Sequence, residues 1–517
     1  MKKYIRLYHT VKYLKLKQIY YRLFYTFRRT YRKIISFRYP YVKNKTTYPL
    51  TFVTSITNCS SYKENSFKFL NLHKKFKNNI DWNYAEHGKL WTYNLTYFEF
   101  LHQKNMSTNE GINIIQDFIK KHPTIKDGME PFPISLRGIN WIKFLSIHTI
   151  KEKDINDFLY RDYTQLLDNV EYHLLGNHLL ENGFSLLFAA YFFQDEKFYK
   201  ESSQLLMTEL EEQILDDGAH FELSPMYHQL MLYRLLDTIN LVKNNHWKKN
   251  ELLPFLIKKA VAMLYWLQVI TYKNGEIPLF NDSAYNIAPT SNELFQYAKR
   301  LNIESSFNHK RNNLSNSGYR KRSNDSYECI IDIGEIGPSY IPGHAHADTF
   351  NFELRITNQP FIVDSGISTY ENNKLRHYQR GTMAHNTVNI QEENSSDTWS
   401  AFRVAQRAKI IHLKEKENFI EATHNGYQKK FHILHTRKWL FDSKKITIQD
   451  TLSRPKNAKA FIHFHPSITK KKIEKHIKIK SNYLFKNYSF ASEYNSLSNA
   501  LMLEIPFNEN LCVEISL

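Results

Sequence analysis

The side chains most able to do chemistry gather in PGHAHADTFNFEL, residues 342–354, where His344, His346 and Asp348 stand two positions apart. If the segment is extended, this spacing turns all three side chains toward one face. A single inward-facing histidine is usually a core residue with satisfied hydrogen bonds. Two of them after a Pro-Gly turn favour a divalent-metal site or a general base, because neutral imidazole serves in both roles.

Two later residues extend this candidate metal site. Asp364 lies in IVDSG, on the return strand of a predicted hairpin, and His385 lies in MAHNTVNI. With His346 they form a His-Asp-His set whose nitrogen and oxygen donors suit Zn²⁺ or a similar ion. The alternative interpretation is that Asp364 caps a turn and that His385 is an ordinary strand residue.

A second group of polar side chains lies in LLGNHLLENGFSLLFAA, residues 174–190. Asn177, His178 and Glu181 fall within about one turn of a predicted helix and share a face at the start of its apolar run. Asn177 could instead simply cap this helix, since asparagine is a good N-cap residue.

The segment DDGAHFELSPMYHQLMLYRLL, residues 216–236, contains a helix start. Ser224 is a good N-cap and Pro225 a good first helical residue, so Tyr227 is expected in the first turn. The positive end of the helix dipole favours a phenolate there, and we therefore expect Tyr227 to exchange a proton near neutral pH. The alternative is an amphipathic tyrosine that bridges core and water.

The elements that must position these groups change type along the chain. From about residue 95 to 305 the apolar residues recur with a helical period, which predicts a helical bundle or toroid. The polar stretch 307–327 has the composition of a linker. From residue 350 the period changes to two, the TNQP turn predicts a hairpin with one buried face, and later runs predict an antiparallel sandwich.

Charge and composition limit the classes of function. The chain has 517 residues, with 70 Lys plus Arg against 51 Asp plus Glu, and a formal charge of +19 that should attract polyanions less strongly as salt rises. Much of this excess lies in a basic-aromatic arm at 1–45. We expect two larger domains after it, a helical one at 46–310 and a β-sandwich at 325–517.

Cysteines and the N-terminus bear on the compartment. Three cysteines without metal-type spacing indicate neither a disulfide framework nor a zinc ribbon. Charges interrupt every apolar stretch near the N-terminus, so neither a cleavable signal nor a spanning helix is predicted. The sequence favours a cytoplasmic or membrane-peripheral protein, whose arm could contact a membrane or a partner, and leaves a periplasmic location open.

Several segments together carry a resemblance to a known family. LWTYNLTYFEFL (90–101), PFPISLRGINWIKFL (131–145), the Asn-His and Ser-Pro-Met-Tyr-His segments, GHAHAD and the HNT motif at 385–387 follow one another in family order. The chain thus resembles the heparinase II/III-like polysaccharide lyases, relatives of some alginate lyases. Many such lyases are secreted, whereas this chain opens with the basic-aromatic arm.

The resemblance implies an incomplete (α/α) toroid followed by an antiparallel β-sandwich, with the active site between them. It also implies cleavage of an acidic glycan beside a uronic acid by β-elimination, in which the carboxylate is neutralised, the C5 proton is removed and the O4 leaving group is protonated. The expected substrate is therefore an anionic polysaccharide.

The resemblance further assigns roles to particular residues. Tyr227 matches the catalytic tyrosine, a general acid that for some sugar epimers is also the base, and His344 matches a partner base or charge neutraliser. The groups that meet the substrate carboxylate are Asn177, His178 and Glu181, and the metal ligands are His346, Asp364 and His385, with Zn²⁺ as the expected ion. Tyr370 is the candidate second tyrosine. The candidate substrate-binding residues, each of which could equally belong to the toroid core, are Trp91, Tyr93, Asn94, Arg137 and Trp141.

Other classes of function stay open at this point. A C5-epimerase or hydrolase on the same fold would share part of the chemistry, although hydrolysis normally needs a carboxylate pair. A non-catalytic glycan-binding or surface-polysaccharide assembly factor could be tethered by the arm. Charge alone suggests a nucleic-acid binder, but no recognisable nucleic-acid module is present, so no nucleic acid is expected as partner.

Overall fold

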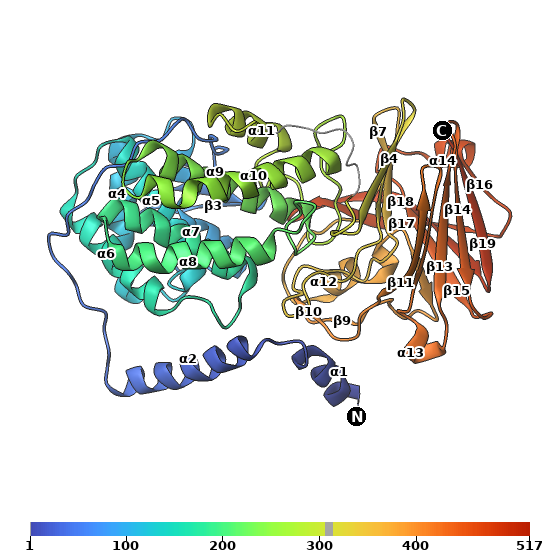
Figure 1. Cartoon of the computed structure of the whole chain (residues 1–517), viewed down its shortest axis with the longest axis horizontal. Helices are drawn as coiled ribbons and strands as arrows, with labels where there is room; N and C mark the ends of the chain where they lie inside the picture. The colour runs from blue at the N-terminus through green and yellow to red at the C-terminus, as the bar shows by residue number, and fades with distance from the viewer. Residues whose placement is uncertain (1, 305–313) are drawn as a thin grey trace.

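The computed structural model describes residues 2–304 and 314–517 (Figure 1). Helices make up one end of the molecule and layers of strands the other, as blue-green and orange-red ribbons show in Figure 1. This is the incomplete (α/α) toroid followed by an antiparallel β-sandwich that the resemblance implied.

The helical domain alternates inner and outer helices. Nearly every residue of α5, α7 and α9 is buried, whereas α4 and α8 keep an exposed polar face and α6 keeps a half-buried one. Because successive helices run in opposite directions, the inner ones begin at the same end of the toroid. The helices are α3 (Lys89–Tyr97), α4 (Thr108–Lys121), α5 (Pro131–Ile147), α6 (Lys153–Asp168), α7 (Gly176–Phe193), α8 (Glu196–Gln213), α9 (Pro225–Asn244), α10 (Lys249–Ile270) and α11 (Ser291–Arg300), with 3₁₀ turns at Glu99–His102 and His122–Thr124.

Helix α10 has a long apolar segment. Among the described residues, its segment Glu251–Ile270 is long and apolar enough to cross a membrane by length and composition alone. It packs against α8, α9 and α11, as a toroid helix does. A small sheet of β1 (Tyr62–Lys63), β2 (Ser66–Phe69) and β3 (Leu72–Lys75) packs on α3.

In the described residues, three antiparallel sheets build the sandwich, in the orders β4-β5-β6-β7, β17-β18-β15-β8 and β11-β12-β13-β14-β19-β16. One apolar core takes residues from all three sheets, among them Phe352, Trp439 and Leu503. The strands are β4 (Tyr319–Ser323), β5 (Tyr327–Asp332), β6 (Phe352–Ile356), β7 (Gln359–Ile362), β8 (Val388–Ile390), β11 (Ile410–Lys416), β12 (Phe419–His424), β13 (His435–Phe441), β14 (Lys445–Leu452), β15 (Ala458–His463), β16 (Ile477–Ile479), β17 (Leu484–Glu493), β18 (Ser496–Phe507) and β19 (Asn510–Ser516). Shorter elements are β9 (Thr398–Trp399), β10 (Arg403–Val404), α12 (Lys374–Gln379), a 3₁₀ turn at Thr382–Ala384, α13 (Gln428–Phe431) and α14 (Lys470–His476).

The hairpin β6–β7 forms where the sequence predicted it, but both of its faces are buried. Thr357 and Asn358 at its turn have positive φ angles of 50° and 63°, as a tight hairpin turn requires. On the side expected to be solvated, Glu353 accepts a hydrogen bond from the Tyr272 hydroxyl at 3.0 Å, and Arg355 pairs with Glu276. The segment after α10 covers this face, so the polar half of the alternation marks the interface between toroid and sandwich.

Two further predictions about strands need correction. Strand β4 lies inside the stretch 307–327, whose composition predicts a linker, and it pairs with β5 from Tyr319↔Asp332 to Ser323↔Glu328. Residues 307–313 of that stretch lie outside the described residues. The segment 344–348 is a loop rather than an extended strand, so its histidines do not owe their positions to alternation along a strand.

The N-terminal arm is folded as two helices, α1 (Lys2–Val11) and α2 (Leu16–Ile34), which run along one side of the molecule (Figure 1). Arg6 pairs with Asp397 of the sandwich at 2.9 Å, and Arg28 pairs with Asp168 of the toroid at 3.0 Å. We call residues 2–34 the strap, because they contact both domains.

Candidate active site between toroid and sandwich

A buried carboxylate, Asp282, is the centre of the candidate site. It lies in the loop between α10 and α11 and is fully buried. One oxygen accepts from His344 Nδ1 and the other from His346 Nε2, each at 2.8 Å, while both oxygens receive the guanidinium of Arg376. Burial alone would raise the pKa of Asp282, but Arg376 and the two imidazoles hold this pKa well below its usual range. Asp282 is therefore a permanent anion.

Tyr227, His344 and Tyr370 lie together beside this anion. The sequence placed Tyr227 correctly, since Ser224 caps α9 and its Oγ accepts from the Tyr227 amide at 3.2 Å. The Tyr227 and His344 rings stack with centroids 3.9 Å apart, and the Tyr227 and Tyr370 hydroxyls are 3.1 Å apart. Tyr227 comes from the toroid and the other two from the sandwich part of the chain. All three are partly or slightly exposed, so an outside molecule can reach them.

The expected phenolate at Tyr227 is wrong. Burial raises the pKa of Tyr227 above its usual value, and the Asp282 and Glu222 carboxylates raise it further, against the opposing hydrogen bond from Tyr370. Loss of water around the hydroxyl outweighs the helix dipole in this setting. Tyr227 therefore keeps its proton near neutral pH.

Glu222 connects the first turn of α7 to His344. The backbone N–H of Asn177 donates to Glu222 Oε1 at 3.2 Å, and Glu222 Oε2 lies 3.6 Å from His344 Nε2. Burial raises the pKa of Glu222. Asn177 is not the helix cap, since that position belongs to Leu175.

His178 and Glu181 lie on the same helix but differ in their surroundings. His178 Nδ1 is 3.1 Å from Glu171 Oε1, and although burial opposes it, this carboxylate raises the pKa of His178. Glu181 is buried and pairs with Arg234 at 2.7 Å. Because its charge is already compensated, Glu181 is a poor partner for a further ligand.

The five predicted substrate-binding residues separate into two groups. Tyr93 and Asn94 are half-buried, and the Tyr93 hydroxyl donates to Glu130 at 2.7 Å. Trp91, Arg137 and Trp141 are at most 1% exposed, so the toroid-core alternative is correct for these three. Arg137, for example, forms an ion pair with Asp162 at 2.7 Å.

A His/Asp/His cluster that could bind a metal lies on the far side of His346. Ligand atoms of His346, Asp348 and His385 lie within 4.8 Å of one another. Within the described part of the chain, the buried atoms His346 Nδ1, Asp348 Oδ2 and His385 Nε2 have no hydrogen-bond partner, which is the state expected of unused ligand atoms. Burial lowers the pKa of His346 to about 3, so its imidazole is neutral, as a ligand must be.

The cluster differs from the predicted ligand set in one member. Asp364 Oδ2 accepts from His385 Nδ1 at 2.7 Å and from Asn351, while Asp364 Oδ1 accepts from the Gly366 amide at 2.8 Å. Both oxygens of Asp364 are therefore engaged, and Asp348 supplies the free carboxylate oxygen instead. Asp364 orients His385 from behind, as Asp282 orients His346.

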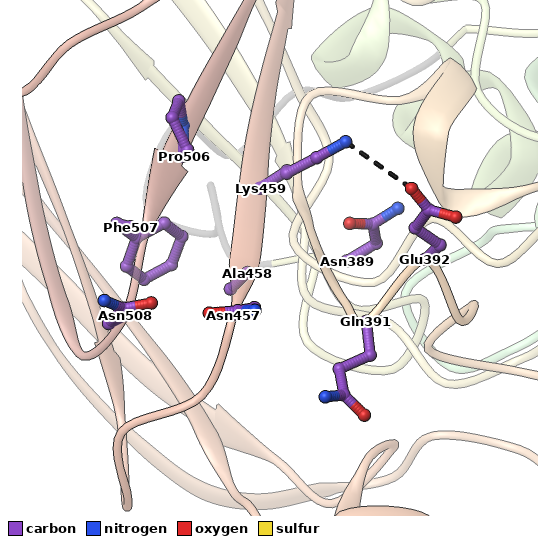
Figure 2. Close-up of a pocket in the computed structure, with 9 residues that line it drawn as sticks. All are labelled: Asn389, Gln391, Glu392, Asn457, Ala458, Lys459, Pro506, Phe507 and Asn508. Atoms are coloured by element: carbon purple, nitrogen blue, oxygen red, sulfur yellow. Dashed lines mark ion pairs between the residues drawn. The ribbon is translucent and has the colours of Figure 1, made fainter.

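A cavity of about 570 Å³ lies elsewhere, on the sandwich between the end of β8, β15 and β18 (Figure 2). Its one cation, Lys459, faces Glu392 at 3.6 Å and also pairs with Glu504 at 3.2 Å. The nine residues that line it include no histidine or tyrosine. This cavity therefore lacks the acid–base groups that gather around Asp282.

The charge balance at Asp282 leads to a first prediction. Arg376→Gln should leave a buried carboxylate without its main counter-charge and destabilise the protein by about 3–5 kcal/mol, which lowers Tm by about 5 °C or more. The double variant Asp282→Asn/Arg376→Gln should recover a large part of this loss, because the uncompensated charge is gone. Thermal unfolding of both variants measures it. A double variant less stable than Arg376→Gln would contradict this charge balance.

Comparison with known proteins places these residues in a family. The model of the heparinase II/III N-terminus matches residues 55–307, and that of the heparinase II/III-like C-terminal region matches 308–502. A heparin-sulfate lyase of Pedobacter heparinus is 27% identical over 259 residues, covering 45% of this chain and 39% of that protein. One of Bacteroides thetaiotaomicron is 24% identical over 245 residues, covering 38% and 34%. These matches thus span about two fifths or less of the curated relatives.

Solved structures agree on the fold. A heparinase III structure superposes with a TM-score of 0.66 at 16% identity, covering 86% of this chain and 80% of that one. A mutant of a heparan sulfate lyase from Pedobacter heparinus gives a TM-score of 0.57 at 17% identity, covering 88% and 81%. With both halves of the chain matched in order by the two family models, the protein belongs to the heparinase II/III-like family.

Proposed function

We propose that this protein is a polysaccharide lyase that cleaves an acidic, uronic-acid-containing glycan by β-elimination. The observation that carries the proposal is the stacked pair of Tyr227 and His344, 3.9 Å apart, beside the permanent anion Asp282. Family membership and the heparin-sulfate lyase relatives support the same class of reaction. Elimination needs one group that donates a proton and one that accepts a proton, and a tyrosine hydroxyl and an imidazole can supply them.

His344 is the proposed base. In the neutral imidazole, Nδ1–H donates to Asp282 at 2.8 Å, and the lone pair on Nε2 is then the one that can accept a proton. Nε2 takes the C5 proton of the uronate, and the electrons of the C5–H bond form the C4=C5 double bond. The C4–O4 bond breaks at the same time, and its electrons leave with O4.

Tyr227 is the proposed acid. Because burial raises its pKa, the hydroxyl holds a proton that it can donate to O4 as the leaving group gains negative charge. Tyr370, 3.1 Å away, can orient the hydroxyl, and the proton taken up by His344 must return to Tyr227, directly or through solvent, before the next turnover. No water is added, so one product ends in an unsaturated uronate.

The negative charge of the substrate carboxylate must be neutralised before the C5 proton is acidic enough to be removed. We assign this to Asn177 and His178, since they begin α7 beside Glu222 and His344. Glu171 favours the protonated form of His178, and a cation is what a uronate carboxylate requires. Glu181, paired with Arg234, supports the helix without meeting the substrate.

A divalent ion, with Zn²⁺ the first candidate, is proposed to bind His346, Asp348 and His385. Nitrogen and oxygen donors in this number suit such an ion. Burial raises the pKa of Asp348 to about 6 despite the opposing charge of His385, and the Asp364 carboxylate raises it further, so a further positive charge here would be favourable. The bound ion would supply this charge and fix the loop that carries His344. His346 shares Asp282 with His344, so its position bears on the base.

Tyr227→Phe tests the acid. The substitution keeps the ring and its stacking but removes the transferable proton, and should lower turnover at least about 10²-fold with little change in Tm. Tyr191→Phe is the matched control, because it removes a buried tyrosine hydroxyl of α7 outside the site. Activity is read as absorbance of unsaturated uronate on a panel of sulfated and unsulfated uronate glycans. Normal turnover by a folded Tyr227→Phe protein would rule out the mechanism.

Elemental analysis tests the ion. We expect about one divalent ion per chain, strong loss of metal in Asp348→Asn, and in Asp364→Asn an affinity weaker by about 10- to 100-fold, as for a residue that orients a ligand. Glu392→Gln, an exposed carboxylate on the sandwich, should bind metal normally. If Asp348→Asn retained the ion while Asp364→Asn lost it, Asp364 would be the ligand and Asp348 would not.

A further inference from the structure

The N-terminal segment 1–45, which contains the strap, carries most of the protein's net charge. Residues 1–45 contain 14 Lys and Arg and no Asp or Glu, which leaves 56 cations against 51 anions and a formal +5 for the rest of the chain. The +19 is therefore a local property of the N-terminal segment rather than a field around the candidate active site.

Helix α2 attaches to the toroid by its polar face. Gln18 is buried and donates to the Leu174 carbonyl, and Arg28 pairs with Asp168. Arg22 donates to the His173 carbonyl at 3.2 Å, and the Tyr25 hydroxyl donates to the Val170 carbonyl at 2.5 Å. These contacts are hydrogen bonds and ion pairs, and they lie on one side of the helix.

The opposite side of α2 is apolar and faces outward. Exposed fractions are 84% for Leu16, 69% for Leu23, 72% for Phe27 and 77% for Ile34. Their spacing of three, four or seven residues places them on one stripe, which also includes Tyr20 and Tyr31. A surface helix normally buries such a stripe against its own core. In α2 the polar face lies against the protein and the apolar stripe faces water, and such an exposed apolar patch indicates an external partner.

A basic pocket of about 270 Å³ lies between α1 and the sandwich. Four cations line it, Lys12 from the strap with Arg407, Lys409 and Lys429, and no carboxylate is among its nine lining residues. The buried Nε of Arg407 has no hydrogen-bond partner among residues 2–304 and 314–517. Such a pocket fits a phosphate group, whose charge would relieve the mutual repulsion of the cations.

We propose that the strap docks on an anionic phospholipid surface. The stripe of α2 enters the boundary between headgroups and acyl chains, and the basic pocket takes a lipid phosphate, as in interfacial amphipathic helices with cationic flanks. A second copy fits less well, because two straps would bring 11 cations each into contact. Nucleic acid would neutralise the charge but leave the apolar stripe in water.

Docking through the strap would hold both domains at the surface. Arg6 contacts the sandwich and Arg28 the toroid, so the strap is part of the folded body. None of the residues assigned to the reaction lies in it. Variants of its outer face should therefore leave turnover on a soluble glycan unchanged.

Vesicle co-sedimentation of the full chain tests this inference. The protein should bind vesicles of phosphatidylcholine and phosphatidylglycerol, bind phosphatidylcholine alone at least about tenfold more weakly, and release as salt rises. Leu23→Ser/Phe27→Ser should weaken binding at least about tenfold, since two large apolar side chains no longer enter the interface. The matched control is Leu484→Ser/Leu497→Ser, which changes two exposed leucines of the sandwich and should bind normally.

A further variant tests the pocket. Lys409→Gln/Lys429→Gln should weaken binding to the anionic vesicles about tenfold or more and have little effect on the residual binding to phosphatidylcholine. Equal binding to both vesicle types, or unchanged binding by Leu23→Ser/Phe27→Ser, would overturn the proposal. So would a wild-type dimer that Leu23→Ser/Phe27→Ser converts to a monomer while neither binds vesicles, because the partner would then be a second copy.

Discussion

The ion-pair network of Asp282 is the constraint on which the candidate site depends. A fully buried carboxylate is costly unless charge and hydrogen bonds compensate it, and three segments must meet to do so. The loop after α10 brings Asp282, the 344–348 loop brings two imidazoles, and α12 brings Arg376. Toroid and sandwich are thereby fixed to each other at the place where Tyr227 and His344 stack.

The same network joins the proposed base to the metal-type cluster. Asp282 holds His344 with one oxygen and His346 with the other, while the second nitrogen of His346 faces Asp348 and His385. A change at the cluster can therefore alter the orientation of His344 without any contact with substrate. Asp364 is hydrogen-bonded to His385 as Asp282 is to His346. Each imidazole of the cluster is therefore oriented by a carboxylate that accepts from its other ring nitrogen.

Local sequence rules predicted those features that depend on neighbouring residues. The Ser224-Pro225 helix start placed Tyr227 in the first turn of α9, the TNQP turn gave the β6–β7 hairpin, and the change of period marked the change from helices to strands. The pKa of Tyr227 could not be inferred this way, because it depends on burial and on Glu222 and Asp282, which are distant or unremarkable in sequence.

Long-range contacts account for the remaining differences. Asp282, Arg376 and Glu222 have no motif spacing, and only the folded chain shows that they meet around His344. Trp91 and Trp141 look like sugar-stacking residues in sequence, yet inner toroid positions and cleft positions use the same aromatic types, and these two are fully buried. The exchange of Asp348 for Asp364 follows from which oxygens the fold leaves unbonded, a matter of three-dimensional geometry.

The most direct test of the central claim, elimination at the Tyr227–His344 pair, is the mass of the products from a defined acidic oligosaccharide. Elimination adds no water, so the masses of the two fragments should sum to the mass of the substrate, and one fragment should be unsaturated. Fragments whose masses sum to the substrate plus one water would show hydrolysis and contradict the account, as would a substrate of unchanged length whose uronate has only exchanged its C5 hydrogen.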